Sequence, residues 1–176
     1  MKKSLSFLLA LLTLTAAVPL AGAVPADSGL SLSCASCVLM EKETGAVLLE
    51  DNAHEKLEPA SVTKIMTLLL VMEAVDSGQL GLDDPVTVSS YAAGMGGSQV
   101  YLEEGEQMPV SEMIKCVTVV SGNDCAVALA ERVAGSEGAF VARMNQRAQE
   151  LGMEDTTFLN CTGLPAQGHV TSAHDI

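Results

Sequence analysis

Ser61 and Lys64 have the spacing at which a lysine can activate a serine. On a helix, residues i and i+3 lie on one face, so the hydroxyl and the amine come within hydrogen-bond reach. A serine is a weak nucleophile until a base removes its proton, and a lysine serves as that base when its pKa is lowered. The start of a helix and strongly apolar surroundings both lower the pKa of a lysine. The pair therefore predicts acyl transfer through Ser61, with a capping serine beside a surface lysine as the structural alternative.

Ser121, Gly122 and Asn123 form a second group of chemical interest, 60 residues after Ser61. We expect them in a short break between two helices, where side chains project into a cleft. A second hydroxyl can relay a proton to a leaving group, and an asparagine amide can hold both the lysine and a substrate amide. A helix that ends at Ser-Gly before a capping asparagine would explain the same residues without catalysis. Two motifs in this order, each at a helix boundary, favour the catalytic interpretation.

A hairpin and four helices are predicted to position these residues. The hairpin joins strands at 37–42 and 46–50 through a turn that contains Gly45. Apolar periodicity and the glycines that end each run predict helices over residues 61–75, 109–120, 125–134 and 136–151. The first of these helices is apolar on nearly every side, which predicts burial all round.

Four finer predictions concern caps and connections. Asn123 or Asp124 is expected to cap the helix that follows, and Ser136 the next one. Residues 79–108, rich in glycine and acidic residues, predict an irregular surface excursion with a strand-like stretch at 85–88. The segment 171–175 has a cap residue with an acid three positions on, which predicts the first turn of another helix.

The composition excludes one class of partner. Nine basic and 22 acidic residues give a net charge of −13, and such a surface repels nucleic acid phosphates and anionic lipid. We therefore exclude nucleic-acid binding. An apolar fraction of 48% fits a globular domain with a real core.

The first 23 residues predict an export signal. Two lysines precede an apolar stretch, and small residues before Val24 suit a cleavage site. A membrane anchor is the alternative, but the stretch is interrupted before the roughly 20 apolar residues that a span needs. We expect a signal peptide at 1–23, a catalytic domain at 24–176 and an extracytoplasmic location in the cell envelope or periplasm.

The cysteines and histidines predict no disulfide framework and no metal site. The five cysteines are an odd number, and the single Cys-x-x-Cys pair has no second pair to complete a zinc site. The three histidines lack ligand spacing. We interpret the cysteines as ordinary buried or incidental thiols: Cys34, Cys37, Cys116, Cys125 and Cys161.

The chain resembles the low-molecular-mass penicillin-binding proteins that act as serine-type D-Ala-D-Ala carboxypeptidases, the peptidase S11 family. The similarity lies in Ser-x-x-Lys within residues 59–67, in Ser-x-Asn within 121–128, in the hairpin, and in the segment 151–175. The resemblance implies an α+β fold of the β-lactamase and DD-peptidase (transpeptidase-like) type, with a helical lobe beside an antiparallel sheet. It also implies Ser61 as the acylated nucleophile, Lys64 as its base, and Ser121 and Asn123 as the second motif.

The resemblance further implies the substrate and the inhibitors. Ser61 would attack the bond between the two terminal D-alanines of a peptidoglycan stem peptide, β-lactams would acylate the same serine, and no metal or organic cofactor is expected. Family members often carry a C-terminal amphipathic anchor, so peripheral membrane association is an expectation for a longer protein.

One family element is not found in the sequence. The third motif, Lys-Thr-Gly, is absent, because no lysine follows Lys115. We therefore expect a truncated catalytic domain without the C-terminal strands of the sheet, and weak or no activity from these 176 residues alone.

Two other functions are compatible with these residues. A class A-like serine β-lactamase would need a deacylating glutamate after the second motif, for which Glu154 is the candidate. A non-catalytic remnant that binds cell-wall peptide is the other alternative. Rapid β-lactam hydrolysis would favour the first, and binding that survives Ser61→Ala would favour the second.

Overall fold

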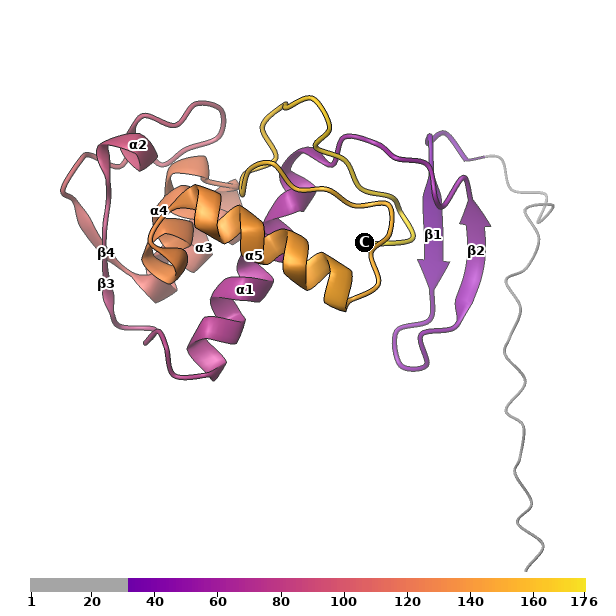
Figure 1. The fold of residues 1–176 in the computed structure, drawn as a ribbon, viewed down its shortest axis with the longest axis horizontal. Helices are drawn as coiled ribbons and strands as arrows, with labels where there is room; N and C mark the ends of the chain where they lie inside the picture. Colours follow the sequence, from indigo (N-terminus) through magenta and orange to yellow (C-terminus); the bar gives the residue numbers. More distant parts are fainter. Residues whose placement is uncertain (1–31) are drawn as a thin grey trace, which may run out of the picture.

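The computed structural model describes residues 32–176, so the predicted signal peptide at 1–23 lies outside the described residues. Within them the chain forms two small antiparallel sheets and a body of helices (Figure 1). No helix in this described stretch is long and apolar enough to cross a bilayer.

The predicted hairpin is confirmed. Strand β1 (Cys37–Met40) pairs antiparallel with β2 (Val47–Asp51), with Leu39 opposite Leu49. The Glu41 carboxylate accepts hydrogen bonds from the backbone N–H of Thr44 at 2.7 Å and of Glu43 at 3.0 Å, which closes the turn. In Figure 1 this hairpin stands at one end of the molecule, and the C-terminal segment runs between it and the helices.

The helical body is centred on α4 (Asn123–Ala134), which packs against the three other long helices. These are α1 (Lys64–Asp76), α3 (Val110–Val120) and α5 (Glu137–Glu150). Nine residues of α4 are buried, and the core around them consists mainly of Val, Ala, Leu and Met side chains with Phe140. Helix α4 is therefore the centre of the helical core, against which α1, α3 and α5 pack.

The strand-like stretch predicted at 85–88 is confirmed, but the prediction that residues 79–108 form an irregular surface excursion is wrong. Strand β3 (Pro85–Thr87) pairs with β4 (Gln107–Pro109), and the short helix α2 (Ser90–Ala93) lies between them. The segment contributes five buried side chains to the core: Leu80, Val86, Val88, Ala92 and Leu102. Leu102 follows Val100 and Tyr101, and Ala92 follows Tyr91, but these apolar runs are short and lie among glycines and acids, so they do not reveal the burial.

The all-round burial predicted for the first helix is also wrong. A short 3₁₀ turn, η1 (Ala60–Thr63), precedes α1, and Ile65 on α1 is 61% exposed. Helices α4 and α5 cover one side of α1, so its apolar surface is only partly buried within residues 32–176.

Of the predicted helix caps, Ser136 is confirmed, whereas Asn123 and Asp124 are wrong. Ser136 caps α5, because its hydroxyl accepts a hydrogen bond from the Ala139 N–H at 3.1 Å. Asn123 and Asp124 are not caps: both lie inside α4, and Gly122 takes the cap position without a side-chain bond. Their side chains are instead used in contacts with the loop before β4.

The helix predicted to start at 171–175 is a single hydrogen-bonded turn. The Ser172 hydroxyl accepts from the Asp175 N–H at 3.2 Å. The Asp175 carboxylate does not close a capping box, because it accepts from the Thr156 hydroxyl at 2.7 Å and the Asp155 N–H at 2.9 Å. The segment is held against the rest of the chain by the antiparallel bridges of Leu57 with Thr171 and Thr157 with Val170.

Candidate active site

Ser61 and Lys64 are brought together as the spacing predicts. The Lys64 amine lies 3.4 Å from the Ser61 hydroxyl oxygen. Ser61 sits in the 3₁₀ turn and is exposed, whereas Lys64 opens α1 and is only 4% exposed. An accessible hydroxyl beside a buried amine is the arrangement that a Ser–Lys nucleophile requires.

Burial is the main influence on the pKa of this lysine. It lowers the pKa of Lys64, and the nearby Cys161 thiol partly opposes that change. The amine donates a hydrogen bond to the Thr162 carbonyl oxygen at 2.7 Å, so its orientation toward Ser61 is fixed from a distant part of the chain. A lysine that loses its proton more easily can accept one from a serine.

The segment that carries Thr162 contacts the backbone of the turn that contains Ser61. Gly163 has φ +85°, and a Cβ at this position would lie 1.8 Å from the Ala60 carbonyl oxygen. Only glycine fits so close to another backbone in this conformation. Ala60 itself has φ +45°, so the turn that presents Ser61 is strained on the other side of the same contact.

The second motif is built on the break between α3 and α4. Ser121 ends α3 in the left-handed conformation, with φ +60°, and its N–H bonds the Cys116 carbonyl. The Asn123 amide group donates to the Gly96 carbonyl at 2.7 Å, and the Asn123 backbone N–H donates to the Ser98 carbonyl at 2.7 Å. The Asn123 side chain and the backbone of Ser121 are thereby held in place by neighbouring backbone.

Two polar atoms of this motif have no partner. Within residues 32–176, the buried side-chain oxygens that lack any hydrogen bond are Ser121 Oγ and Asn123 Oδ1. Buried polar atoms are almost always paired, because an unpaired one costs about 1–3 kcal/mol. Both unsatisfied oxygens belong to the motif in which the sequence predicts catalytic residues.

The two motifs are connected through a glycine loop. Helices α1 and α4 pack together, and a Cβ on Gly97 would lie 2.8 Å from Asn123 Nδ2 and 3.5 Å from Leu164 Cδ2. Leu164 follows Gly163, which contacts the turn of Ser61. No hydrogen bond links Ser121 or Asn123 directly to Ser61 or Lys64 in the part of the chain that the structure describes.

The family of D-alanyl-D-alanine carboxypeptidases, peptidase S11, matches residues 23–176 of the chain. The chain belongs to this family. It is 52% identical over 149 residues to the D-alanyl-D-alanine carboxypeptidase DacF of Bacillus subtilis, with 85% of this chain and 38% of that protein covered. It is 41% identical over 152 residues to DacC of Escherichia coli, with 83% and 38% covered. The chain thus spans less than two fifths of the length of these carboxypeptidase relatives.

Solved structures of the carboxypeptidase family have the same fold. The D-alanyl-D-alanine carboxypeptidase DacD from Francisella tularensis superimposes with a TM-score of 0.82 at 38% identity, covering 84% of this chain and 36% of that one. Penicillin-binding protein D2 from Listeria monocytogenes, in an ampicillin-bound form, gives 0.72 at 31% identity, covering 83% and 59%. The α+β DD-peptidase fold predicted from the sequence is confirmed.

Sequence reasoning about this carboxypeptidase-family chain missed the residues that surround Lys64. The Thr162 carbonyl accepts a hydrogen bond from the Lys64 amine. The Cys161 carbonyl accepts one from the Thr67 hydroxyl at 2.7 Å. His169, 2% exposed, bonds the Thr63 hydroxyl through Nε2 at 2.8 Å. A main-chain carbonyl has no signature in residue types, and His169 carried no ligand spacing that would have drawn attention to it.

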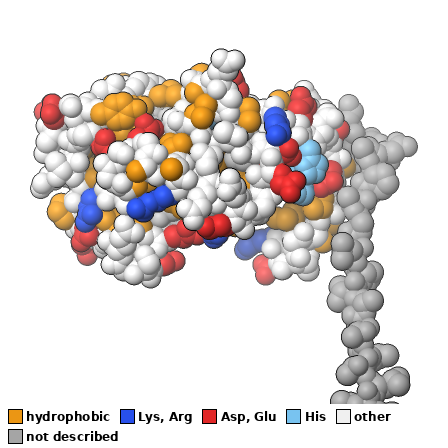
Figure 2. All heavy atoms as spheres, in the orientation of Figure 1, with side chains coloured by type: hydrophobic (Ala, Val, Ile, Leu, Met, Phe, Trp, Pro, Cys, Tyr) orange, Lys and Arg blue, Asp and Glu red, His pale blue; other side chains and the backbone are white. Residues whose placement is uncertain are grey.

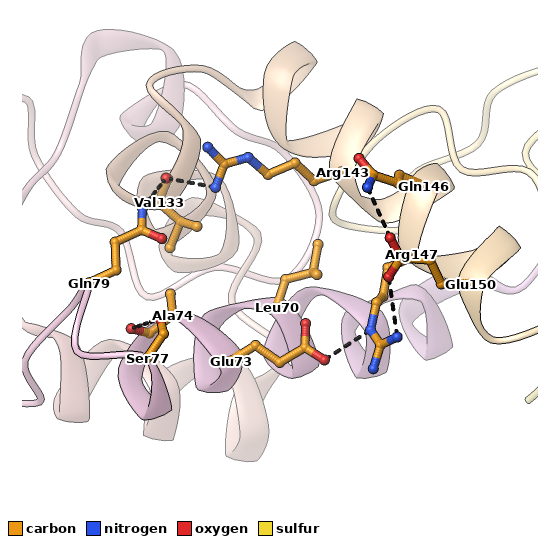
Figure 3. Close-up of a pocket in the computed structure, with 10 residues that line it drawn as sticks. All are labelled: Leu70, Glu73, Ala74, Ser77, Gln79, Val133, Arg143, Gln146, Arg147 and Glu150. Carbon is orange, nitrogen blue, oxygen red and sulfur yellow. Dashed lines mark hydrogen bonds and ion pairs between the residues drawn. The ribbon is translucent and has the colours of Figure 1, made fainter.

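A pocket of about 340 Å³ at the far end of α1 carries no comparable chemistry. Figure 3 shows its arginines already engaged: Arg147 bonds Glu73 on α1 at 2.9 Å, and Arg143 bonds the Val133 carbonyl at 3.3 Å. A smaller pocket of about 180 Å³ adjoins the turn before Ser61 and is lined by Ala60, Gly163 and His169 among others. The pocket next to the turn of Ser61 is thus smaller in volume than the pocket at the far end of α1.

The described surface and the thiols offer no metal site. No group of three or more His, Cys, Asp or Glu side chains in residues 32–176 is placed to hold an ion. All five cysteines are free, and burial raises the pKa of Cys125 and Cys161, which keeps both protonated. Figure 2 shows acidic side chains spread over the visible face, with the only visible histidines grouped beside acidic residues at one end.

Proposed function

We propose that the protein is a serine-type D-Ala-D-Ala carboxypeptidase that removes the terminal D-alanine from peptidoglycan stem peptides. The observation that carries the proposal is the exposed Ser61 hydroxyl 3.4 Å from the buried Lys64 amine. The names of its relatives supply the reaction.

Acylation of Ser61 is the first half of the reaction. The Ser61 oxygen bonds the carbonyl carbon between the two D-alanines while its proton passes to the Lys64 amine. The backbone N–H at the start of the helix favours the oxyanion that forms. The peptide bond then breaks, and we assign the Ser121 hydroxyl, whose oxygen has no partner of its own, to deliver a proton to the departing D-alanine nitrogen. The proton that Lys64 took from Ser61 replaces the one lost by Ser121, so the amine is neutral again before hydrolysis.

Hydrolysis completes the cycle. Water attacks the acyl-serine, and Lys64 takes a proton from that water and returns one to Ser61. The unpaired Asn123 oxygen can accept an N–H of the bound peptide, which would place the scissile bond over Ser61. The sequence calls for no metal or organic cofactor in any of these steps.

Location and inhibitors follow from the same proposal. A carboxypeptidase of cell-wall peptides works outside the cytoplasm, and the family match begins at residue 23, next to the end of the predicted signal peptide. The relative from Listeria monocytogenes is named as penicillin-binding and was solved with ampicillin, which supports β-lactams as acylating inhibitors. Peripheral membrane attachment of a longer protein stays a prediction.

A fluorescent penicillin tests the nucleophile. The mature chain is incubated with it beside Ser61→Ala and Ser77→Ala, a serine at the opposite end of the same helix, and the adduct is located by peptide mass spectrometry. A single acylation needs no turnover, so even with the weak activity expected of these residues we predict a slowly formed adduct on Ser61 in the parent and in Ser77→Ala, and none in Ser61→Ala. No adduct on a cooperatively folded parent, or an adduct elsewhere, contradicts the proposal.

The lifetime of the adduct separates this function from a class A-like β-lactamase. Glu154, the candidate deacylating residue, is exposed and makes no hydrogen bond with Ser61 or Lys64 in the described structure. We expect an adduct that persists for minutes or longer, whereas hydrolysis within seconds would favour the β-lactamase.

A further inference from the structure

We propose that Asn160 is a positioning residue: its side chain fixes the Thr162 carbonyl against the Lys64 amine and so keeps the amine directed at Ser61. The inference rests on the proposed function, in which Lys64 is the base. It adds a residue that neither motif contains.

Asn160 organises the loop with one side chain. Its Oδ1 accepts three hydrogen bonds, from the Gly163 N–H at 2.7 Å, the Thr162 N–H at 3.1 Å and the Thr162 hydroxyl at 3.1 Å. Its Nδ2 donates to the Leu164 carbonyl at 2.8 Å. Four bonds from one partly buried amide leave residues 162–164 little freedom to turn.

The orientation of the Thr162 carbonyl decides that of the amine. A neutral lysine amine has two N–H bonds and one lone pair, and one N–H is directed to the Thr162 oxygen at 2.7 Å. The amine donates to the Ser61 hydroxyl oxygen at 3.4 Å, and in its neutral form the lone pair can turn to that hydroxyl and accept its proton. If the carbonyl turned away, the amine would lose its fixed direction, and proton transfer depends on that direction.

The same asparagine also acts on the nucleophile's turn. Its Oδ1 accepts a hydrogen bond from the Gly163 N–H, and the Cα of Gly163 faces the Ala60 carbonyl. A loop released at Asn160 would therefore move away from both Lys64 and the turn of Ser61. Base and nucleophile are positioned by one side chain that touches neither.

The loop keeps water away from Lys64, and this gives a measurable signature. Burial is the main cause of the lowered pKa of Lys64, and Cys161 acts on the amine in the opposite direction. A loosened loop admits water, which stabilises the ammonium form, so the pKa of Lys64 should rise. A residue that served stability alone would lower the melting temperature without moving this titration.

The experiment is an NMR titration of the lysine side chains in the 176-residue chain, with ¹³C-labelled lysine and Lys64 assigned from a Lys64→Met sample. The variants are Asn160→Ala, which removes all four bonds, and Asn160→Ser, which keeps an uncharged acceptor oxygen. Asn145→Ala is the matched control, because Asn145 bonds the Phe158 backbone in the same way, at 2.8 Å in both directions, in the same segment.

We expect the Lys64 midpoint to rise by about one pH unit in Asn160→Ala, by less in Asn160→Ser, and not at all in Asn145→Ala. A midpoint unchanged in the asparagine-160 variants overturns the inference, as does an equal rise in Asn145→Ala. If Asn160→Ala does not fold, Asn160→Ser decides alone. The titration needs no substrate, so its failure is distinct from failure of the proposed function, which is the lack of an adduct on Ser61.

Discussion

The Thr162 carbonyl oxygen accepts a hydrogen bond from the Lys64 amine at 2.7 Å, although the two residues stand 98 positions apart in the chain. The acceptor is a main-chain atom, so no side-chain replacement at position 162 removes it. A substitution can change only the shape of the loop that presents this carbonyl, and that effect differs from the loss of the Ser61 hydroxyl or the Lys64 amine.

Replacement of Lys64 by Met should remove the base and keep the aliphatic stem. We expect acylation of Ser61 by a penicillin to slow by about a hundredfold to ten-thousandfold, the usual contribution of a positioned base. The rate is followed by adduct formation over time. Lys115→Met is the control, because Lys115 is exposed and pairs with Glu112 at 2.7 Å on the surface of α3. A rate within tenfold of the parent would show that Lys64 is not the base.

Gly163→Ala should both destabilise the fold and disturb the nucleophile. Its Cβ would lie 1.8 Å from the Ala60 carbonyl, and φ +85° disfavours any side chain. We expect a loss of about 2–4 kcal/mol in the free energy of unfolding, measured with urea. We also expect the penicillin adduct on Ser61 to form more slowly. Gly168→Ala is the matched control: its φ of +93° gives similar strain, but the nearest atom is 3.9 Å away. Equal losses in the two variants would contradict the steric argument.

His169 should make the fold less stable in acid. Its Nδ1 accepts from the Leu159 N–H at 2.9 Å, so the proton lies on Nε2, which donates to the Thr63 hydroxyl. Burial lowers the pKa of His169, with Glu58 acting weakly in the opposite direction. The unfolded chain therefore takes up the proton first. The contribution to stability is complete above about pH 6.5 and is lost as the pH falls through the lower pKa of the folded state.

The melting temperature at pH 8 and at pH 5 checks this sign. We expect a drop in the parent that is smaller in His169→Gln. His54→Gln serves as the control, because the His54 side chain is 64% exposed on the surface. A parent that melts at the same temperature at both values would rule out the proposed contribution of His169.

Asp124→Asn should release the loop that holds Asn123. The buried Asp124 carboxylate accepts from Val100 and Leu102 N–H groups at 3.0 and 3.2 Å, and from the Cys125 N–H at 2.9 Å. An amide must turn its own NH₂ toward at least one of these donors, which should cost about 2–3 kcal/mol. Urea unfolding measures the loss, with the exposed Asp83→Asn as control. An undiminished stability of Asp124→Asn would mean that the loop does not depend on this carboxylate.

Much of the fold and the contact between Ser61 and Lys64 could be predicted from the sequence, because both depend on local patterns. The hairpin follows from two apolar runs around Gly45, and the Ser61–Lys64 contact follows from i, i+3 spacing on a helical turn. The second motif was located for the same reason, at the break between α3 and α4. Its two unpaired oxygens became visible only with the surrounding backbone in place.

The failures arose where long-range packing outweighs local preference. Asp124 has the residue type of a helix cap, yet its carboxylate bonds a loop more than 20 positions earlier. The buried residues of 79–108 lie in short apolar stretches separated by glycines and acids, and they come together only in the folded core. The carbonyls around Lys64 have no side-chain signature at all. The positions of the two motifs could therefore be predicted from the sequence, and the main-chain atoms that surround Lys64 could not.

The 98-residue separation of Lys64 from its carbonyl partner also has a consequence for the order of events during folding. Until residues 160–164 have closed over α1, water surrounds the amine, the amine keeps its proton, and Ser61 is an ordinary inert alcohol. Helix α1 can form early, since its contacts are local, but closure of a loop this long is a late and entropically costly step. Under the proposed function, a newly made and still unfolded chain thus carries a latent nucleophile, and Ser61 becomes reactive only when the tertiary structure is complete.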